Sequence, residues 1–410
     1  MTKRLKVHAN REVCIVGISR TPIGSLQGSL ASKSAVELGA IAIQSALERS
    51  GVSGDLVEEV FLGHVISGGT GQAPARQAAL KAGLPNTVPC SAINKVCASG
   101  MKAVALASQA IMLGLRDIVI AGGMESMTNA PHMSNTLRGG ARFGDVSFVD
   151  AIQRDGLNDA FDNVPMGNFA EATAAKFTLS RADQDGYAAS SYHKAVTATE
   201  QGKFKAEIVP VPVVLKRGHA PSYIELDDEA FARSVSVETL GKLRPCFTPA
   251  ASVTAGNASP ISDGAAALVL VSREKAIELG LSIVAVVRGF DDAAHDPQWF
   301  TTAPSVAIPK ALQRADLTVA DVDFFEINEA FSAVALANTQ LLHLDANKVN
   351  VYGGAVALGH PLGCSGARII VTLCSVLAQE NGRIGCAAVC NGGGGASAIV
   401  IERVPTSTPA

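Results

Sequence analysis

Two cysteines and one histidine lie in segments that are rich in glycine and other small residues. Cys97 lies in NKVCASGMKA, just before an apolar run that predicts a helix. His360 is followed by Pro361 in GGAVALGHPLGCSGAR, and Cys390 comes shortly before four glycines at 392–395. Small neighbours leave room for a ligand to approach, so these three side chains are the first candidates for chemistry.

Cys97 is a candidate nucleophile, because a predicted helix start lies directly after it. The start of a helix favours a thiolate by about 0.3–2 kcal/mol, and one pKa unit corresponds to about 1.36 kcal/mol. The helix alone therefore lowers the pKa of the thiol by little more than one unit, and a base or a cation must supply the rest. A buried, inert cysteine is the commoner alternative.

His360 is the type of side chain that best accepts a thiol proton near neutral pH. The proline after it disfavours helical geometry, which predicts a loop between a strand and a helix that starts at 363–364. A histidine with only a structural role is the alternative. The glycines at 392–395 expose backbone N–H groups that suit an anion nest or an oxyanion hole, or else they form a plain tight turn. They are not a phosphate-binding P-loop, because no Lys-Ser/Thr pair follows.

Asn328 and Glu329 follow a predicted buried strand in FFEINEAFS. An amide at this place can hold a water molecule, and a carboxylate can orient a neighbour or be the first-turn acid of a helix. Two thiols and an imidazole fit acyl transfer, in which one thiol takes the acyl group and the other moves a proton. Two rivals remain open: a cysteine hydrolase, which needs one thiol, and a redox enzyme, which needs thiols close in sequence.

The elements that must position these groups alternate between strand and helix patterns. In the first third of the chain, strands are predicted at 13–19, 57–66 and 116–125, and helices at 35–50 and 74–84. This alternation is typical of parallel α/β layers. The pattern returns later, with strand elements predicted at 263–272, 322–331 and 349–359 and an antiparallel pair with a glycine turn at 385–402.

The two α/β parts resemble each other. VCASGMKAVALASQAI and GCSGARIIVTLCSVL each contain Cys, then Ser-Gly, then an apolar helix pattern, and a strand follows each. We therefore expect a duplicated fold. Residues 128–258 are richer in Asn, Asp, Pro and charged side chains, which predicts an inserted domain or a long excursion between the two parts.

Composition narrows the class of protein. The 410 residues are too many for one ordinary core, so two or three domains are expected. Hydrophobic residues make up 48% and charged residues 17%, which excludes a disordered chain. The net charge of −3 provides no long-range attraction to nucleic acid or to an anionic membrane. No apolar run reaches the roughly 18 residues that span a bilayer, so no membrane association is expected.

Cysteine usage and the chain ends predict a reduced, cytoplasmic compartment. The eight cysteines include no CxxC pair. Cys386 and Cys390 lack a second Cys or His pair at zinc spacing, so neither a disulfide framework nor a metal site is expected. No secretory apolar segment precedes the first predicted strand, and the C-terminal TSTPA is not a peroxisomal SKL signal.

Six ordered motifs resemble the thiolase family, from about residue 12 to residue 402. They are NKVCASGMKA, GGMESM, TAGNAS, NEAF, GGAVALGHPLGCSGAR and CNGGGGAS. Within the family, GGMESM, SVTAGNAS and FTTAPSVAIPKAL are most similar to acetyl-CoA C-acetyltransferases of the eukaryotic cytosolic type. NAPHMSNTLRGGARFGD is similar to the tetramerisation loop of the biosynthetic branch.

The resemblance implies an α/β thiolase fold, with two similar halves in a five-layered αβαβα arrangement and an inserted loop domain. The N-terminal half would comprise residues 1–127 and 259–284 and carry the nucleophile. The loop domain, 128–258, would cover CoA and carry the tetramerisation loop. The C-terminal half would comprise 285–410.

The resemblance also implies an activity, the reversible Claisen condensation of two acetyl-CoA to acetoacetyl-CoA and CoA, with a place in the mevalonate pathway. In this ping-pong scheme Cys97 carries the acetyl group, His360 takes the thiol proton, and Cys390 removes a proton from the second acetyl-CoA. The backbone N–H groups of Cys97 and Gly392 would form one oxyanion hole. His360, with a water held by Asn328, would form the other. No cofactor is implied, because coenzyme A is part of substrate and product.

Other site residues carry over from the family by position. The residues that match the lining of the pantetheine tunnel are Leu157, Met166, Ala255, Ser259 and Phe331. Thr239 matches a polar contact to CoA. Pro165 stands where many biosynthetic members have His, which affects the expected acyl-chain preference. Ala230 lies near the place of a tyrosine in potassium-activated members, so potassium is not expected. The implied assembly is a homotetramer, a dimer of dimers.

Two alternatives to this function remain. One is a degradative 3-ketoacyl-CoA thiolase that accepts longer chains. The other is a catalytically silent thiolase-like protein that binds acyl-CoA or lipid. The presence of every expected chemical group in the sequence argues against the second alternative.

Overall fold

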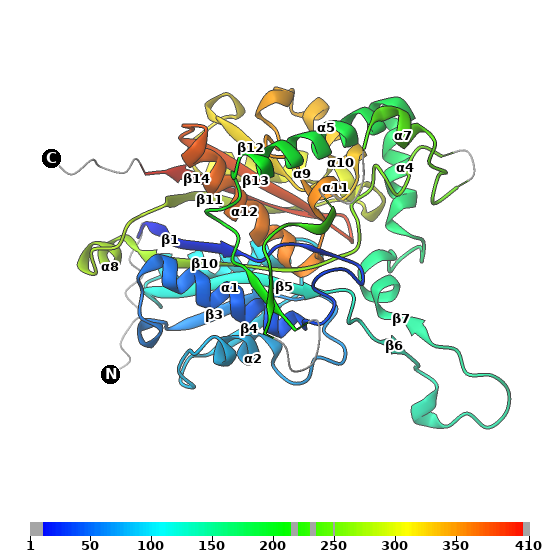
Figure 1. Ribbon diagram of the computed structural model, residues 1–410. Coiled ribbons are helices and arrows are strands. Elements are labelled where there is room, and N and C mark those ends of the chain that lie inside the picture. Colours follow the sequence, from blue (N-terminus) through cyan, green and yellow to red (C-terminus); the bar gives the residue numbers. More distant parts are fainter. Residues whose placement is uncertain (1–10, 215–219, 230–234, 249–250, 405–410) are drawn as a thin grey trace, which may run out of the picture.

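The computed structural model describes residues 11–214, 220–229, 235–248 and 251–404. Two α/β halves lie one above the other in Figure 1, the N-terminal half in blue and cyan below and the C-terminal half in yellow to red above. Ala230, on which the expectation about potassium depends, lies outside the described residues.

Five strands form the sheet of the N-terminal half. β3 runs parallel to β4 and β5, and β10 runs antiparallel to β5 and β1. β1, β5 and β10 are buried along their whole length, which explains their near-continuous runs of Ala, Val, Ile, Leu and Gly. In spatial order the strands are β4 (Cys90–Ile93), β3 (Glu59–Gly63), β5 (Ile118–Ser126), β10 (Ser262–Ser272) and β1 (Val13–Arg20), and the short β2 (Gly24–Ser25) pairs with β10.

The C-terminal half repeats this strand order. β12 is parallel to β13, and β14 is antiparallel to both β13 and β11. The counterpart of β4 is reduced to one parallel bridge between Phe325 and Val349. The predicted duplication is therefore confirmed in the order and direction of the strands. The strands are β12 (Phe324–Ile327), β13 (Ile384–Asn391), β14 (Gly395–Arg403) and β11 (Ala285–Ala294).

The two halves form five layers, as expected. α3 and α12 lie in the middle, where their apolar side chains share one core with strands of both halves. The outer face of the N-terminal half is covered by α1 and α2, and the outer face of the C-terminal half by α9. The layer helices are α1 (Ala35–Ser50), α2 (Pro74–Lys81), α3 (Ser99–Met112), α9 (Pro304–Arg314) and α12 (Leu362–Gln379).

Hydrogen bonding continues from one half into the other, which the sequence did not predict. β1 and β11 pair antiparallel through three residue pairs, from Val13 with Val287 to Ile15 with Ala285. The pairing makes one connected ten-stranded sheet. The stacking of the halves is therefore fixed at one edge by backbone bonds, as well as by the shared apolar core.

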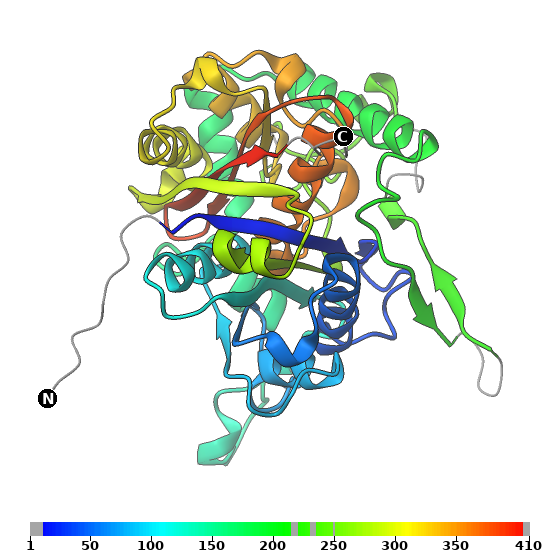
Figure 2. The same ribbon diagram turned by 90° about the vertical axis from the view of Figure 1, so that its left-hand side faces the viewer.

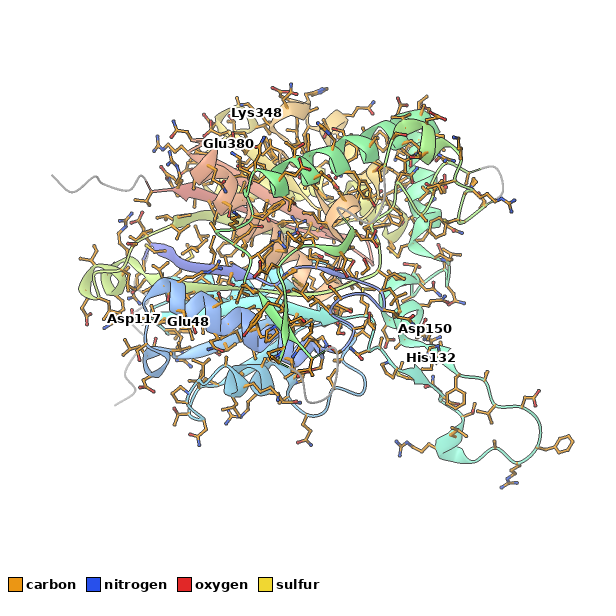
Figure 3. The ribbon with its side chains drawn as sticks, viewed as in Figure 1. Glu48, Asp117, His132, Asp150, Lys348 and Glu380 are labelled. Carbon is orange, nitrogen blue, oxygen red and sulfur yellow. The ribbon has the colours of Figure 1, made fainter. Side chains whose placement is uncertain are left out.

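The middle of the chain supplies helices and two projecting hairpins. The hairpin of β6 (His132–Met133) and β7 (Val149–Asp150) extends far from the body, with His132 and Asp150 at its base in Figure 3. The second hairpin, β8 (Val211–Val213) with β9 (Ser222–Ile224), runs down one side of the N-terminal half in Figure 2. The helices are α4 (Met166–Lys176), α5 (Arg181–Glu200) and α7 (Val237–Gly241).

Buried charges tie this middle segment to the layers. The guanidinium of Arg20, at the end of β1, donates to Glu207 at 2.6 Å and to Asp227 at 2.8 Å. Glu329 accepts hydrogen bonds from Tyr187 at 2.7 Å and Ser191 at 2.8 Å, both on α5. Breaking a buried, hydrogen-bonded charge pair leaves an uncompensated charge, so these contacts resist separation of the segment from the layers.

Three local expectations differ from the structure. The strand expected at 349–359 is only the bridge at Val349, a turn, and the short helix α11 (Ala355–Leu358). Glu329 is not a first-turn acid, because α10 (Ser332–Leu341) begins three residues later. α12 is long and apolar enough to cross a membrane, with a mean hydropathy of 1.5, but 89% of that window is buried inside the protein. It is a core helix, which explains its apolar composition. A further helix, α8 (Arg273–Glu278), follows β10.

Candidate active site

A strained turn presents Cys97 at the start of α3. Val96, directly before it, has φ +48°, a left-handed conformation that is unusual for a β-branched residue. Local hydrogen bonds hold the turn: the Val96 N–H donates to the Asn94 side chain at 2.9 Å, and the Ser99 hydroxyl donates to the Val96 carbonyl at 2.5 Å. The Lys95 N–H donates to that same hydroxyl at 2.8 Å. The turn therefore fixes where the thiol points.

The side chain of Lys95 anchors this turn to the opposite half of the molecule. Its ammonium group donates to Asp292 on β11 at 3.0 Å, and on β14 to the Ala396 carbonyl at 3.0 Å and the Ser397 hydroxyl at 2.8 Å. The position of Cys97 thus depends on how the two halves stack.

His360 lies in a loop before α12, as expected, but the element before this loop is the short helix α11 and not a strand. Its Nδ1 lies 2.6 Å from the hydroxyl of Ser365, in the first turns of α12, and its backbone N–H donates to the Ser262 hydroxyl at 3.2 Å. The Asn328 side-chain nitrogen lies 3.4 Å from each ring nitrogen. Gly359, with φ +116°, makes the turn possible, because a Cβ there would lie 2.5 Å from the Ser262 hydroxyl. The ring is therefore oriented by Ser365 and Asn328, and its backbone is held by Ser262.

Cys390 and the glycines after it face Cys97 from the end of β13. Although burial raises the pKa of the Cys97 thiol more, the N–H groups of Gly392 and of Cys97 itself lie close enough to its sulfur to lower that pKa. Cys390 is fully buried and packs against Met166, Phe300 and Ala330. Burial is the main cause of the raised pKa of Cys390, and a charge on the Cys97 sulfur raises it further, which places the two sulfurs near each other. The two thiols therefore belong to one site.

These groups meet at an apolar cavity of about 450 Å³. Cys97, His360 and Gly392 line it. Five residues of the predicted tunnel line the same cavity, namely Leu157, Met166, Ala255, Ser259 and Phe331. Asn328 and Cys390 are buried directly behind this wall. An apolar cavity with a few convergent polar groups is the usual form of a small-molecule site.

Thr239 lies elsewhere among the described residues. It is exposed on α7, where its N–H donates to the Ser236 hydroxyl at 3.1 Å in a capping box, and it does not line the cavity. A contact between Thr239 and CoA outside this cavity therefore stays a prediction.

Burial decides the resting charge of the reactive groups. It raises the pKa of the Cys97 thiol to about 12, although the two backbone N–H groups lower it. Burial, followed by the positive charge of Arg368, lowers the pKa of His360 to about 3. Burial also raises the pKa of Cys390 well above its ordinary value. Near pH 7 the site therefore holds two neutral thiols and a neutral imidazole, because desolvation outweighs the helix start.

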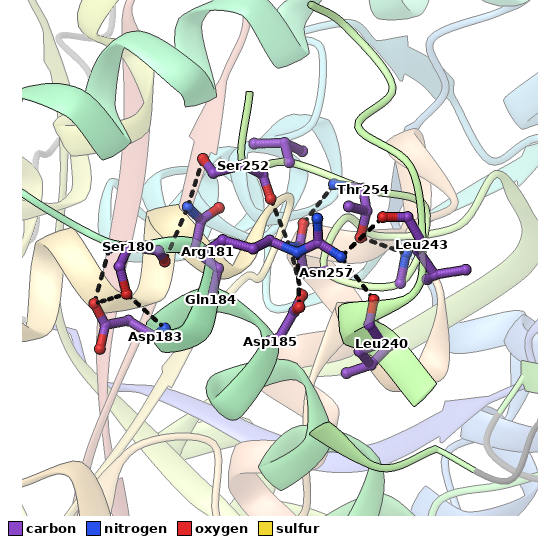
Figure 4. A network of polar contacts seen from close by, with 12 residues as sticks. Ser180, Arg181, Asp183, Gln184, Asp185, Leu240, Leu243, Ser252, Thr254 and Asn257 are labelled. Carbon is purple, nitrogen blue, oxygen red and sulfur yellow. Dashed lines mark hydrogen bonds and ion pairs between the residues drawn. The ribbon is translucent and has the colours of Figure 1, made fainter. Parts of the chain in front are cut away.

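A network of polar contacts holds the wall that carries Ala255 and Ser259, and Figure 4 shows it. Asn257 donates to Asp185 of α5 at 2.9 Å and accepts from the Thr254 N–H at 2.8 Å. Arg181 donates to Asp185 at 2.7 Å and to the Leu240 carbonyl at 2.6 Å. The wall is thus attached to α5 and α7 of the middle segment.

Two aromatic residues of the cavity were missed by sequence reasoning. Phe300 is buried, and Phe247 packs edge-on against Phe331 with ring centroids 6.3 Å apart. A Cβ on Gly167 would lie 2.0 Å from the Phe247 ring, so Gly167 leaves space for this side chain. Nothing local marks an aromatic residue as a cavity wall, because only the fold decides what lies opposite it.

No group of three or more His, Cys, Asp or Glu side chains that could hold a metal ion occurs in residues 11–214, 220–229, 235–248 and 251–404. The donors that surround the cavity are thiols, one imidazole, one amide and backbone N–H groups. This set suits acyl chemistry at sulfur, with N–H groups to stabilise an oxyanion.

Comparison with known proteins gives a consistent picture. The profile described as "Thiolase, N-terminal domain" matches residues 13–274, and that described as "Thiolase, C-terminal domain" matches 281–403. "Acetyl-CoA acetyltransferase 2" of Arabidopsis thaliana is 55% identical over 393 residues, which cover 96% of this chain and 97% of the relative. "Acetyl-CoA acetyltransferase ERG10, cytosolic" of Gibberella zeae is 54% identical, with 96% and 98% covered. The crystal structure of the Bacillus anthracis acetyl-CoA acetyltransferase superposes with a TM-score of 0.94 at 39% identity, covering 97% of this chain and 100% of that one.

Proposed function

The chain belongs to the thiolase family, and from this premise we propose that it is an acetyl-CoA acetyltransferase. It joins two acetyl-CoA into acetoacetyl-CoA and CoA, and it also catalyses the reverse cleavage. The observation that carries the proposal is the meeting of Cys97, His360 and the Gly392 N–H at one apolar cavity. The relatives at 53–55% identity over nearly the whole chain carry this activity in their names.

In the first half-reaction Cys97 becomes acetylated. His360 takes the thiol proton as the sulfur attacks the carbonyl carbon of acetyl-CoA, and the N–H groups of Cys97 and Gly392 receive the oxyanion. The C–S bond to CoA then breaks. The departing CoA thiolate takes a proton from Cys390, so that CoA leaves as a thiol. The enzyme is left with an acetyl thioester, an imidazolium and a Cys390 thiolate.

In the second half-reaction this thiolate is the base. Cys390 removes a proton from the methyl group of the second acetyl-CoA, and the imidazolium of His360, with a water held by Asn328, stabilises the enolate oxygen. The carbanion attacks the acetyl carbon, the bond to Cys97 breaks, and the Cys97 sulfur recovers its proton from His360. Each enzyme group thus regains its starting protonation state: Cys390 holds the methyl proton, because its own proton left with CoA. The neutral resting state of the site fits this cycle, because charge develops only once acetyl-CoA has reacted.

The experiment is to trap the intermediate. Incubation with acetyl-CoA, followed by digestion and peptide mass spectrometry, should locate one acetyl group on Cys97. Cys97→Ala should abolish both acetylation and condensation. Cys390→Ala should lose condensation at least a thousandfold while the Cys97 peptide still becomes acetylated.

The control for these variants is Cys386→Ala, a buried thiol on β13 that does not line the cavity. It should keep both activities. Acetylation of another cysteine, or full turnover by Cys97→Ala, would show that the assignment is wrong.

Acyl-chain preference separates this function from its close rival. The cavity includes Met166 and the buried Phe300, which cluster with Cys390. These bulky side chains restrict the space for a long acyl chain, and we expect thiolysis of acetoacetyl-CoA to exceed that of a 3-keto C16 thioester at least tenfold. Faster turnover of the long substrate would favour a degradative 3-ketoacyl-CoA thiolase.

Assembly and location are part of the same proposal. Phe143 and Phe148, on the projecting loop between β6 and β7, are exposed to solvent, as an interface between subunits would require. A homotetramer, a cytoplasmic location and a place in the mevalonate pathway are proposed accordingly. One relative is named as cytosolic, which supports the location. We also retain the division into an N-terminal half, a loop domain over CoA and a C-terminal half with His360 and Cys390.

A further inference from the structure

Glu125 is a fully buried carboxylate that the proposed cycle does not use. It lies near the end of β5, beneath the start of α12, and is 0% exposed. A buried carboxylate is costly unless its oxygens are hydrogen-bonded, so its contacts indicate what it holds in place.

Its two oxygens accept three backbone N–H groups from two separate segments. Gly363, in the first turn of α12, donates at 2.9 Å. Val65 and Ile66, just after β3, donate at 3.1 Å and 3.2 Å. Glu125 therefore joins the end of β5, the segment after β3, and the helix start that follows His360.

The packing around Gly363 leaves this helix start little freedom. A Cβ at Gly363 would lie 2.7 Å from the Met124 carbonyl and 3.0 Å from the Glu125 carboxylate. The same turn of α12 contains Leu362, which lines the cavity, and Ser365, which contacts the His360 ring at 2.6 Å. Movement of this turn would displace both the cavity wall and the imidazole.

The charge of Glu125 also reaches the nucleophile. Four titratable groups face it: His64 after β3, Asp263 on β10, Cys97 before α3 and Cys364 on α12. Neither ring nitrogen of His64 has a hydrogen-bond partner in the described part of the chain, and burial lowers its pKa to about 4. His64 is therefore neutral near pH 7 and supplies no counter-charge. Burial is the main cause of the raised pKa of Cys97, and the negative charge of Glu125 raises it further.

We propose that Glu125 is a positioning residue for acyl transfer: it fixes the helix start after His360, and its charge adds to the burial that keeps Cys97 protonated in the free enzyme. This inference rests on the proposed roles of Cys97 and His360. Burial raises the pKa of Glu125 to about 7, so its charge is present at pH 8 and largely absent at pH 6. The effect of Glu125 on the Cys97 thiolate is therefore present at pH 8 and largely absent at pH 6.

The test uses the full-length enzyme and two substitutions that separate charge from position. Glu125→Gln removes the charge and replaces an acceptor with an amide that repels the backbone N–H groups. Glu125→Asp keeps the charge but withdraws it by one methylene. We expect both to lower kcat for acetoacetyl-CoA thiolysis about tenfold or more, with KM for CoA within threefold, because Glu125 touches no substrate.

Alkylation of Cys97 by iodoacetamide without substrate gives the second readout. At pH 8, Glu125→Gln should react about threefold faster than the parent, because the lost charge lowers the pKa of the thiol by about half a unit or more. At pH 6 the two rates should agree, because Glu125 is then mostly protonated in the parent. At pH 8, Glu125→Asp should be alkylated at the same rate as the parent, because it keeps the charge.

The matched control is Glu207→Gln, an equally buried carboxylate that binds Arg20 away from the cavity. It should lower Tm, but the ratio of its Cys97 alkylation rate at pH 8 to that at pH 6 should equal the ratio in the parent. A parent-like kcat in both Glu125 variants would overturn the inference. So would an alkylation rate of Glu125→Gln that, relative to the parent, is the same at pH 6 and pH 8. If Glu125→Gln does not fold, the kcat of Glu125→Asp decides. Turnover by Cys97→Ala would instead refute the proposed function itself.

Discussion

At the scale of single residues, the site depends on burial more than on any local charge. Cys97 lies at a helix start, yet burial raises its pKa to about 12 and lowers that of His360 to about 3. A neutral thiol beside a neutral imidazole is stable without substrate. Proton transfer between them becomes favourable only when a carbonyl carbon is placed to accept the sulfur.

Burial of His360 predicts a loss of stability in acid. Its ordinary pKa is 6.5 and its folded pKa is about 3, so between these values the unfolded chain binds a proton that the folded chain does not. Each pH unit below 6.5 then costs about 1.4 kcal/mol, or about 2 kcal/mol at pH 5. The fall in Tm between pH 7 and pH 5 should be smaller in His360→Asn than in the parent.

His343→Asn is the control for this prediction, because His343 is exposed on the loop after α10. The Tm of His343→Asn should fall between pH 7 and pH 5 by as much as the Tm of the parent does. Equal falls in all three proteins would mean that His360 does not remain neutral in the folded state.

At the scale of elements, glycines let α12 begin in direct contact with the N-terminal half. A Cβ at Gly63, Gly100 or Gly123 would lie 2.6, 2.9 or 1.9 Å from the carbonyl oxygen of Gly363. β3, α3 and β5 each supply one of these glycines. This close approach places the His360 loop beside the start of α3, where Cys97 lies.

The same chemical change should therefore have opposite effects in two elements. Gly123→Ala forces a methyl group into the Gly363 backbone, and we expect a loss of about 3 kcal/mol or more, or little folded protein. Gly186→Ala, on α5, meets nothing within 4 Å and should raise stability by up to about 1 kcal/mol, because alanine favours a helix. Thermal unfolding measures both. A stable, fully active Gly123→Ala would contradict the packing described here.

At the scale of the whole molecule, the two halves build the site together while the middle segment closes it. Cys97 comes from the N-terminal half, and His360 and Gly392 come from the C-terminal half. Glu329 and the network around Asn257 attach the cavity wall to α5. The β6–β7 hairpin takes no part in this cavity, and its exposed aromatic tip leaves it free for contact between subunits.

The proposed tetramer is tested at this hairpin. Phe143 and Phe148 are 103% and 59% exposed, and replacing both with Ser should convert a tetramer into dimers without loss of the folded protomer. Light scattering after size exclusion gives the mass. Ile277→Ser, an exposed apolar residue on α8 at 68%, should leave the mass unchanged. A parent that is not tetrameric, or a tetramer that survives the double change, would refute the proposal.

The sequence by itself determined the chemical groups, the strand and helix patterns and the family, because these depend on residue type and local order. The flexible glycines and Pro361 beside the reactive residues, the apolar runs and the six motifs were sufficient for the duplicated α/β fold and for the candidates Cys97, His360 and Cys390. The tertiary structure decided which of these residues meet. It placed Thr239 away from the cavity, reduced the strand expected at 349–359 to a bridge and a short helix, and gave Glu125 its contacts with α12. It also decided the resting charges, because desolvation depends on everything that packs around a group, and residues distant in the sequence do most of that packing.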